Sequence, residues 1–137
     1  MKRNKLFIML TLFVAVMCIC SCVTSSGNAD SWYSVNDGKL IVMLEGNATT
    51  GYSWVSKIEN PGILEVSDIQ YIPDELKANS GMVGFGGVWK CEFTAVGAGE
   101  TTVLFSYERP WEDNSSVEQK KLTVSVSETG QIRVLTE

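Results

Sequence analysis

Three short segments of the sequence gather residue types that could engage another molecule. Their threonine hydroxyls are short and stiffly held, and their glycines allow a partner to come close to the backbone. Arginine and tryptophan are enriched at the energetic centres of protein interfaces. These residue types indicate a binding function more than a catalytic one. The three segments are Asn47-Ala48-Thr49-Thr50-Gly51-Tyr52, Gly84-Phe85-Gly86-Gly87 and Arg109-Pro110-Trp111.

Each segment also has a plain structural explanation. In the first, Asn47 can close an Asx-turn and Gly51 can take a positive φ, so it could be an ordinary connection between two strands. The glycine segment could be a flexible surface loop. A phosphate-binding loop is disfavoured there, because a strand pattern and not a helix follows it. The third segment could be a packed loop in which Trp111 covers a sheet edge.

Enzymatic and metal chemistry find little support, because the sequence contains no histidine. That absence excludes Ser-His-Asp and Cys-His catalysis and histidine-ligated metal sites. Cys91 lies in an alternating segment, so we expect a small buried apolar residue with no base to activate it. Glu112 and Asp113 are adjacent acids on a polar loop, and such acids are usually just solvated. We therefore expect no enzyme, no catalytic residue, no metal and no cofactor.

Short strands must position the three segments. Apolar and polar residues alternate most cleanly from Val88 to Ala95 and from Thr101 to Glu108, and such alternation is typical of half-buried strands. Turn signals recur about every eight to twelve residues, a pattern typical of an antiparallel β-sandwich of seven or eight strands. One helical turn is expected over Pro73–Ala78. The expected strands cover 31–35, 39–45, 54–58, 63–72 with a bulge, 88–95, 101–108 and 117–126, with a short final strand or a trailing segment over 131–135.

The N-terminus has the composition of an export signal. Lys2, Arg3 and Lys5 precede an apolar run over 6–20, which is too short and too early for a good membrane-spanning helix. Ile19-Cys20-Ser21-Cys22 resembles a lipobox, in which the last cysteine is lipidated and becomes the new N-terminus, although Cys20 departs from the usual small residue. An ordinary secretory signal that is cleaved nearby is the alternative.

This interpretation divides the chain into a lipoprotein-type signal peptide (1–21), a tether (22–30) and one domain (31–137). We expect an extracytoplasmic protein that is anchored to a cell membrane through lipid on Cys22, or secreted if the lipobox interpretation fails. Loss of 1–21 would remove three of the 11 Lys+Arg residues and none of the 16 Asp+Glu residues, leaving 8 against 16 and a net charge of −8. That acidity argues against a nucleic-acid partner.

Taken together, the three segments resemble the motifs of the chagasin family of cysteine-peptidase inhibitors. That family carries an Asn-Pro-Thr-Thr-Gly-aromatic loop, a Gly-x-Gly-Gly loop and an Arg-Pro-Trp loop in the same order, over about 31–126 here. The resemblance implies an immunoglobulin-like sandwich that inhibits papain-like peptidases reversibly, without being cleaved. We expect the protein to be a monomer. By matching position, Thr49 and Thr50 would lie nearest the peptidase's catalytic cysteine, and the other two loops would flank them in the cleft.

One departure from the family pattern concerns Ala48, which stands where the family usually has proline. Proline would reduce the freedom of the loop before binding, so the departure bears on affinity. A second hypothesis is a surface-anchored binding or adhesion module, for example for glycans, with Tyr52, Trp54 and Trp111 as stacking platforms. Fold alone cannot decide between the two, because β-sandwiches carry many functions.

Overall fold

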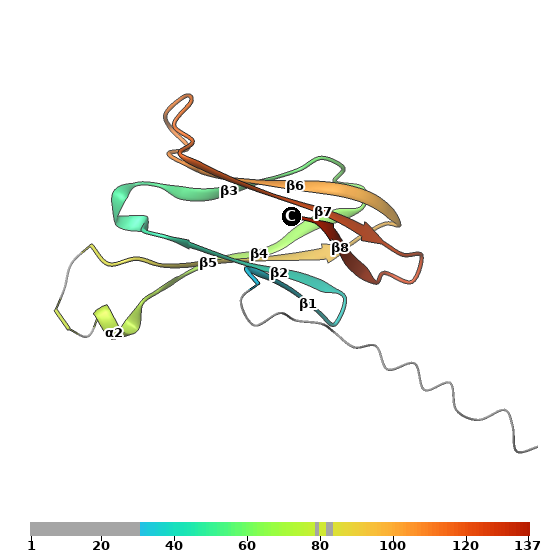
Figure 1. The fold of residues 1–137 in the computed structure, drawn as a ribbon, viewed down its shortest axis with the longest axis horizontal. Helices are drawn as coiled ribbons and strands as arrows, with labels where there is room; N and C mark the ends of the chain where they lie inside the picture. Colours follow the sequence, from blue (N-terminus) through green and yellow to red (C-terminus); the bar gives the residue numbers. More distant parts are fainter. Residues whose placement is uncertain (1–30, 79, 82–83) are drawn as a thin grey trace, which may run out of the picture.

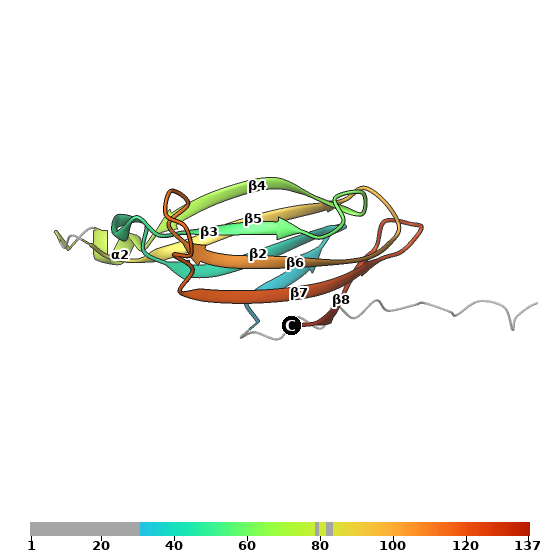
Figure 2. The same ribbon diagram turned by 90° about the horizontal axis from the view of Figure 1, so that it is seen from above.

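Residues 31–78, 80–81 and 84–137 are described by a computed structural model, which forms eight strands in two antiparallel sheets stacked face to face (Figures 1 and 2). The expected signal peptide, the lipidation site Cys22 and the tether lie outside the described residues. Two short helices complete the fold, a 3-10 turn η1 (Ala48–Thr50) and a single turn α2 (Glu75–Ala78). The predicted all-β, immunoglobulin-like sandwich is confirmed, as is the predicted helical turn.

The first sheet begins with a hairpin. Asp37 and Gly38 both have positive φ, 49° and 73°, which gives the two-residue turn whose twist suits a hairpin. The bulge predicted in the fourth strand lies between Val66 and Asp68, where the register shifts against β5. The sheet has the spatial order β1 (Tyr33–Asn36), β2 (Lys39–Gly46), β5 (Gly87–Ala95) and β4 (Leu64–Pro73).

The second sheet is built around two long neighbouring strands. β6 and β7 pair from Gly99↔Val126 to Tyr107↔Glu118, so the chain runs out along one and back along the other. The short last strand is present and pairs with β7, which settles the alternative left open for 131–135. The spatial order is β3 (Ser53–Ile58), β6 (Gly99–Glu108), β7 (Glu118–Val126) and β8 (Ile132–Thr136).

The core lies between the two sheets and follows the predicted alternation. Phe93 of β5 and Phe105 of β6 are fully buried and meet edge to face, with ring centroids 5.8 Å apart. On the outer face of the first sheet, Glu92 pairs with Lys90 and Lys39. No helix in the described part of the chain is long and apolar enough to cross a membrane.

Candidate functional site

The strand pairings bring the three sequence segments to the same end of the sandwich. Gly46 at the end of β2 pairs with Gly87 at the start of β5, and Pro73 at the end of β4 pairs with the same glycine. In the other sheet, Ser53 at the start of β3 pairs with Glu108 at the end of β6. Both ribbon views show the three connections side by side, with the β2–β3 loop between the other two (Figures 1 and 2).

We call 47–52 the threonine loop, and its first residue organises it. The Asn47 side-chain oxygen accepts hydrogen bonds from the Thr49 backbone N–H (3.0 Å) and the Thr49 hydroxyl (2.6 Å). The Thr50 hydroxyl donates to the Asn47 carbonyl at 2.6 Å. Gly51 ends the 3-10 turn with φ 81°, a conformation that favours glycine. The predicted Asx-turn and positive φ are therefore present, and Thr49 and Thr50 are exposed at the tip.

The glycine loop (84–87) is tied to the threonine loop by the same asparagine. The Asn47 side-chain amide donates to the Gly84 carbonyl at 2.8 Å. Gly86 and Gly87 have internal reasons to lack a side chain. A Cβ on Gly86 would lie 3.2 Å from the Gly46 carbonyl oxygen, and one on Gly87 would lie 2.8 Å from the Tyr71 ring and closer still to a backbone oxygen. These glycines allow β2, β4 and β5 to approach one another at this end of the first sheet.

The Arg-Pro-Trp loop (109–111) touches the threonine loop from the other side. The Arg109 guanidinium lies over the Tyr52 ring, 4.6 Å from its centroid, and donates to the Thr50 carbonyl at 3.5 Å. Glu112 accepts two hydrogen bonds from the same guanidinium, at 3.3 and 3.4 Å. Because both ionic side chains are partly exposed, this pair orients Arg109 more than it stabilises the fold.

Trp111 covers Gly51 but remains open to solvent. A Cβ on Gly51 would lie 3.0 Å from the Trp111 ring, so only glycine lets the indole lie this close to the loop. The indole is nevertheless 68% exposed. The possibility that Trp111 is a packed cover for a sheet edge therefore fits the structure poorly. An exposed aromatic face next to the exposed threonines is what an interface anchor requires.

Tyr107 lies beneath the threonine loop and was not among the predicted site residues. Its hydroxyl accepts a hydrogen bond from the Asn47 N–H (2.8 Å) and donates one to the Asn47 carbonyl (3.3 Å). Its ring contacts Tyr52 and Trp54, with centroids 5.3 and 5.2 Å away. The available sequence signal was its place as the last inward residue of an alternating strand, directly before the Arg-Pro-Trp segment.

Two other sequence interpretations can be checked at this end and in the core. Trp54 was expected to serve as an exposed stacking platform in the glycan hypothesis, and this is wrong. It is only 4% exposed, packs in the core, and donates from its indole to the Glu45 carbonyl at 2.9 Å. Cys91 is buried as expected, and burial raises the pKa of its thiol to about 11, which keeps it protonated and unreactive at neutral pH.

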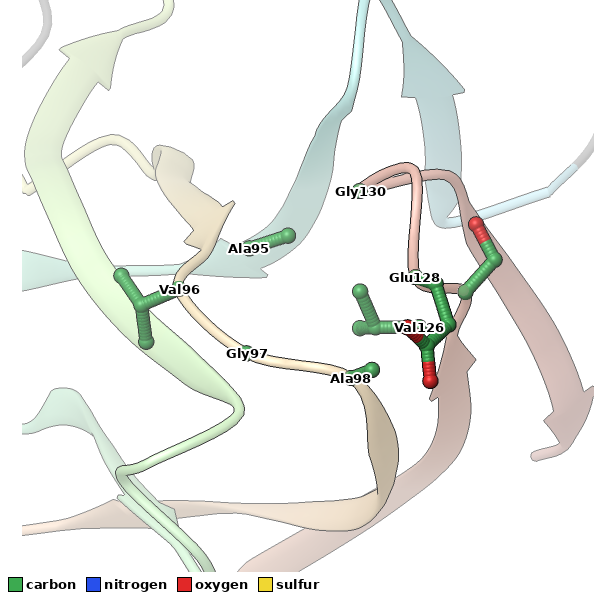
Figure 3. Close-up of a pocket in the computed structure, with 8 residues that line it drawn as sticks. Ala95, Val96, Gly97, Ala98, Val126, Glu128 and Gly130 are labelled. Atoms are coloured by element: carbon green, nitrogen blue, oxygen red, sulfur yellow. The ribbon is translucent and has the colours of Figure 1, made fainter.

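The opposite end of the sandwich carries a shallow hollow of about 200 Å³. Val96, Gly97 and Ala98 line one side of it, and Val126 and Glu128 line the other (Figure 3). Its walls are mostly small side chains and backbone. Nowhere in the described part of the chain do three or more potential metal ligands converge. The three-loop end is therefore the best-built candidate site on the molecule.

Comparison with known proteins agrees with the fold. The sequence is 33% identical over 85 residues to Amoebiasin-1 of Entamoeba histolytica, covering 62% of this chain and 78% of that protein. It is 34% identical over 96 residues to Amoebiasin-2 of the same organism, covering 68% and 72%. The crystal structure of the Entamoeba histolytica cysteine protease inhibitor EhICP2 superposes with a TM-score of 0.54 at 26% identity, covering 62% of this chain and 75% of that one.

The family model of the chagasin family peptidase inhibitors, I42, matches residues 35–126, which include every strand from β2 to β7 and all three loops. That match covers more than half of the chain. The expected resemblance is thereby confirmed at the level of the family, and this protein belongs to the chagasin family of peptidase inhibitors.

Proposed function

We propose that this protein is a reversible, non-covalent inhibitor of papain-like cysteine peptidases, and that its three loops enter the active-site cleft together as a wedge. The observation that carries this proposal is the contact between the loops. Asn47 links the threonine loop to Gly84, and Arg109 links it to the Arg-Pro-Trp loop. A surface that is already assembled loses less conformational entropy when it docks.

In this proposal the threonine loop meets the catalytic cysteine of the peptidase. Thr49 and Thr50 are exposed at its tip, between the two flanking loops. Their backbone forms a 3-10 turn that ends in a left-handed glycine, and it offers no extended segment for the peptidase to cleave. The protein thus presents hydroxyls and backbone groups to the catalytic centre and needs no catalytic residue of its own.

The flanking loops supply area and anchoring. Trp111 offers a large exposed ring, and Pro110 holds the backbone beside it at a fixed φ. A wedge of standard size would bury on the order of 1,600 Å² in total, and a few central residues would carry most of the binding energy. The predicted contact residues are 47–52, 84–87 and 109–111.

We base the proposed site of action on the N-terminal sequence. The lipobox-like segment that ends at Cys22 favours an extracytoplasmic inhibitor held at a membrane by lipid on that cysteine, with cleavage after residue 21 and a short tether over 22–30. We propose that it acts there as a monomer. Mass analysis of the protein recovered from membranes tests the anchor, because lipidated and merely cleaved N-termini differ in mass.

The decisive experiment measures inhibition of papain by the purified protein, followed by intact-mass analysis of both partners. We expect competitive inhibition at nanomolar to micromolar concentration, with neither chain cut nor covalently modified. Absence of inhibition of papain and of two related peptidases, by protein shown to be folded, would contradict the proposal. That result would favour the glycan-binding hypothesis, for which Trp111 remains as an exposed aromatic after the burial of Trp54. The Tyr52 ring is half-buried, with the Arg109 guanidinium over it.

A further inference from the structure

We propose that Tyr107 is a positioning residue that holds the threonine loop in its binding shape through a single hydroxyl group. The inference rests on the proposed function, since it explains how the central loop of the wedge is held. Tyr107 is only partly exposed and lies at the end of β6, below the tip of the wedge. It acts through Asn47 and needs no contact with the peptidase.

The Tyr107 hydroxyl satisfies both backbone groups of one residue. It accepts from the Asn47 N–H at 2.8 Å and donates to the Asn47 carbonyl at 3.3 Å, which uses the donor and an acceptor position of a phenol. Asn47 is the residue where β2 has ended and η1 has not yet begun. No strand ladder therefore holds its backbone, and the hydroxyl takes the place of one.

Asn47 passes this constraint to the rest of the loop. Its carbonyl accepts from the Thr50 N–H and hydroxyl, and its side chain accepts from the Thr49 N–H and hydroxyl. The same side chain donates to the Gly84 carbonyl. One residue thus determines the position of both exposed threonines and of the neighbouring glycine loop, and Tyr107 holds that residue.

The Tyr107 ring is itself held firmly. Tyr52 and Trp54 contact it at centroid distances of 5.3 and 5.2 Å. On a third side the ring lies against Gly46, where an added Cβ would come within 3.1 Å of it. Because rings and backbone restrain it, the hydroxyl keeps a defined position at the inner side of the threonine loop. The hydroxyl oxygen can therefore hold the Asn47 backbone in one position.

The test is Tyr107→Phe, which keeps the ring and removes only the hydroxyl. We expect the inhibition constant for papain to rise about tenfold, which corresponds to ~1.4 kcal/mol. We also expect the backbone NMR order parameters of Thr49 and Thr50 to fall below those of the unmodified protein. Tyr33→Phe is the matched control, because Tyr33 lies on β1 opposite Val42 and outside the three loops; both quantities should stay unchanged there.

A rescue variant separates positioning from general damage. Ala48→Pro stiffens the loop by another route, so adding it to Tyr107→Phe should restore part of the lost inhibition and part of the lost order. A lesion of the core would not respond to a proline in the loop. Recovery of both inhibition and loop order supports the proposal. If the proline fails to restore inhibition, or fails to restore loop order, the result counts against the proposal.

The remaining outcomes are also decisive. Unchanged order parameters in Tyr107→Phe would overturn the proposal, whether or not inhibition weakens, because the hydroxyl would then not hold the loop. Order parameters that fall while inhibition stays the same would overturn it as well, because the held shape would not be the binding shape. If the unmodified protein inhibits no papain-like peptidase, the proposed function fails, and the order parameters still report whether Tyr107 holds the loop.

Discussion

Replacing Ala48 by proline should tighten peptidase binding, and the local geometry indicates why the ring would fit. Ala48 is the first residue of η1, the helical position that proline favours, since the N–H at that position lies outside the helix's own ladder. The preceding residue must be extended for a following proline, and Asn47 has φ −127° and ψ 102°. Asn47 therefore already has roughly the required backbone conformation.

The size of the effect follows from the freedom that proline removes. A proline at a compatible site contributes about 0.4–1 kcal/mol by restricting the flexible state. If the threonine loop samples other shapes before docking, the same restriction lowers the cost of binding and the inhibition constant should fall about two- to fivefold. The gain requires that the Thr49 N–H keep its hydrogen bond to the Asn47 side chain, 3.0 Å long here.

The assay is competitive inhibition of papain by the original protein, by Ala48→Pro and by Ala48→Gly. Glycine at the same position adds backbone freedom, so it should raise the inhibition constant while proline lowers it. Melting temperatures of all three proteins show whether the fold survives. An unchanged or higher inhibition constant for a fully folded proline variant would refute the reasoning, because it would mean that the loop is already rigid or that proline moves the tip.

Three further changes test other parts of the structure. Trp111→Ala should weaken inhibition tenfold or more with little change in melting temperature, because the ring is 68% exposed; a drop in stability with inhibition by the folded fraction intact would make Trp111 a packing residue. Gly87→Ala should destabilise the fold by about 1–3 kcal/mol in denaturant unfolding, because its Cβ would overlap β4 backbone; wild-type stability would show that β4 can move aside. Raising the pH from about 9 to about 11 should cost about 2–3 kcal/mol of stability more than in Cys91→Ala, because the unfolded thiol ionises near 9 while burial raises the folded pKa to about 11; parallel pH curves for the two proteins would contradict this.

The sandwich could be predicted largely from side-chain alternation. In β5 and β6 every second residue faces the core, and the sequence shows the same period without interruption. The hairpin at Asp37-Gly38 and the bulge in β4 could also be predicted. Asp-Gly favours a two-residue hairpin turn, and no single alternation fits the apolar stretch over 63–72. The three loops were found because their residue types are unusual and stand between such strands.

Long-range packing was beyond the reach of the sequence. Trp54 was placed correctly in a strand but its face was misjudged, because the inward set of β3 is Trp54, Ser56 and Ile58, and the serine breaks the apolar pattern. Tyr107 lies in a segment that was predicted as a half-buried strand, yet its role depends on the contact of its hydroxyl with Asn47, a residue 60 positions away along the chain. No local sequence pattern encodes this contact, because it depends on how the two sheets stack.

The relative position of the three loops depends on that same stacking. The glycine loop joins two strands of the first sheet, and the Arg-Pro-Trp loop joins two strands of the second. Of the three loops, only the threonine loop passes from one sheet to the other. A shift between the sheets would separate the flanking loops, and the contacts of Asn47 with Gly84 and of Arg109 with Tyr52 oppose it. The packing between the sheets near this end therefore determines the arrangement of the three loops as well as the stability of the fold.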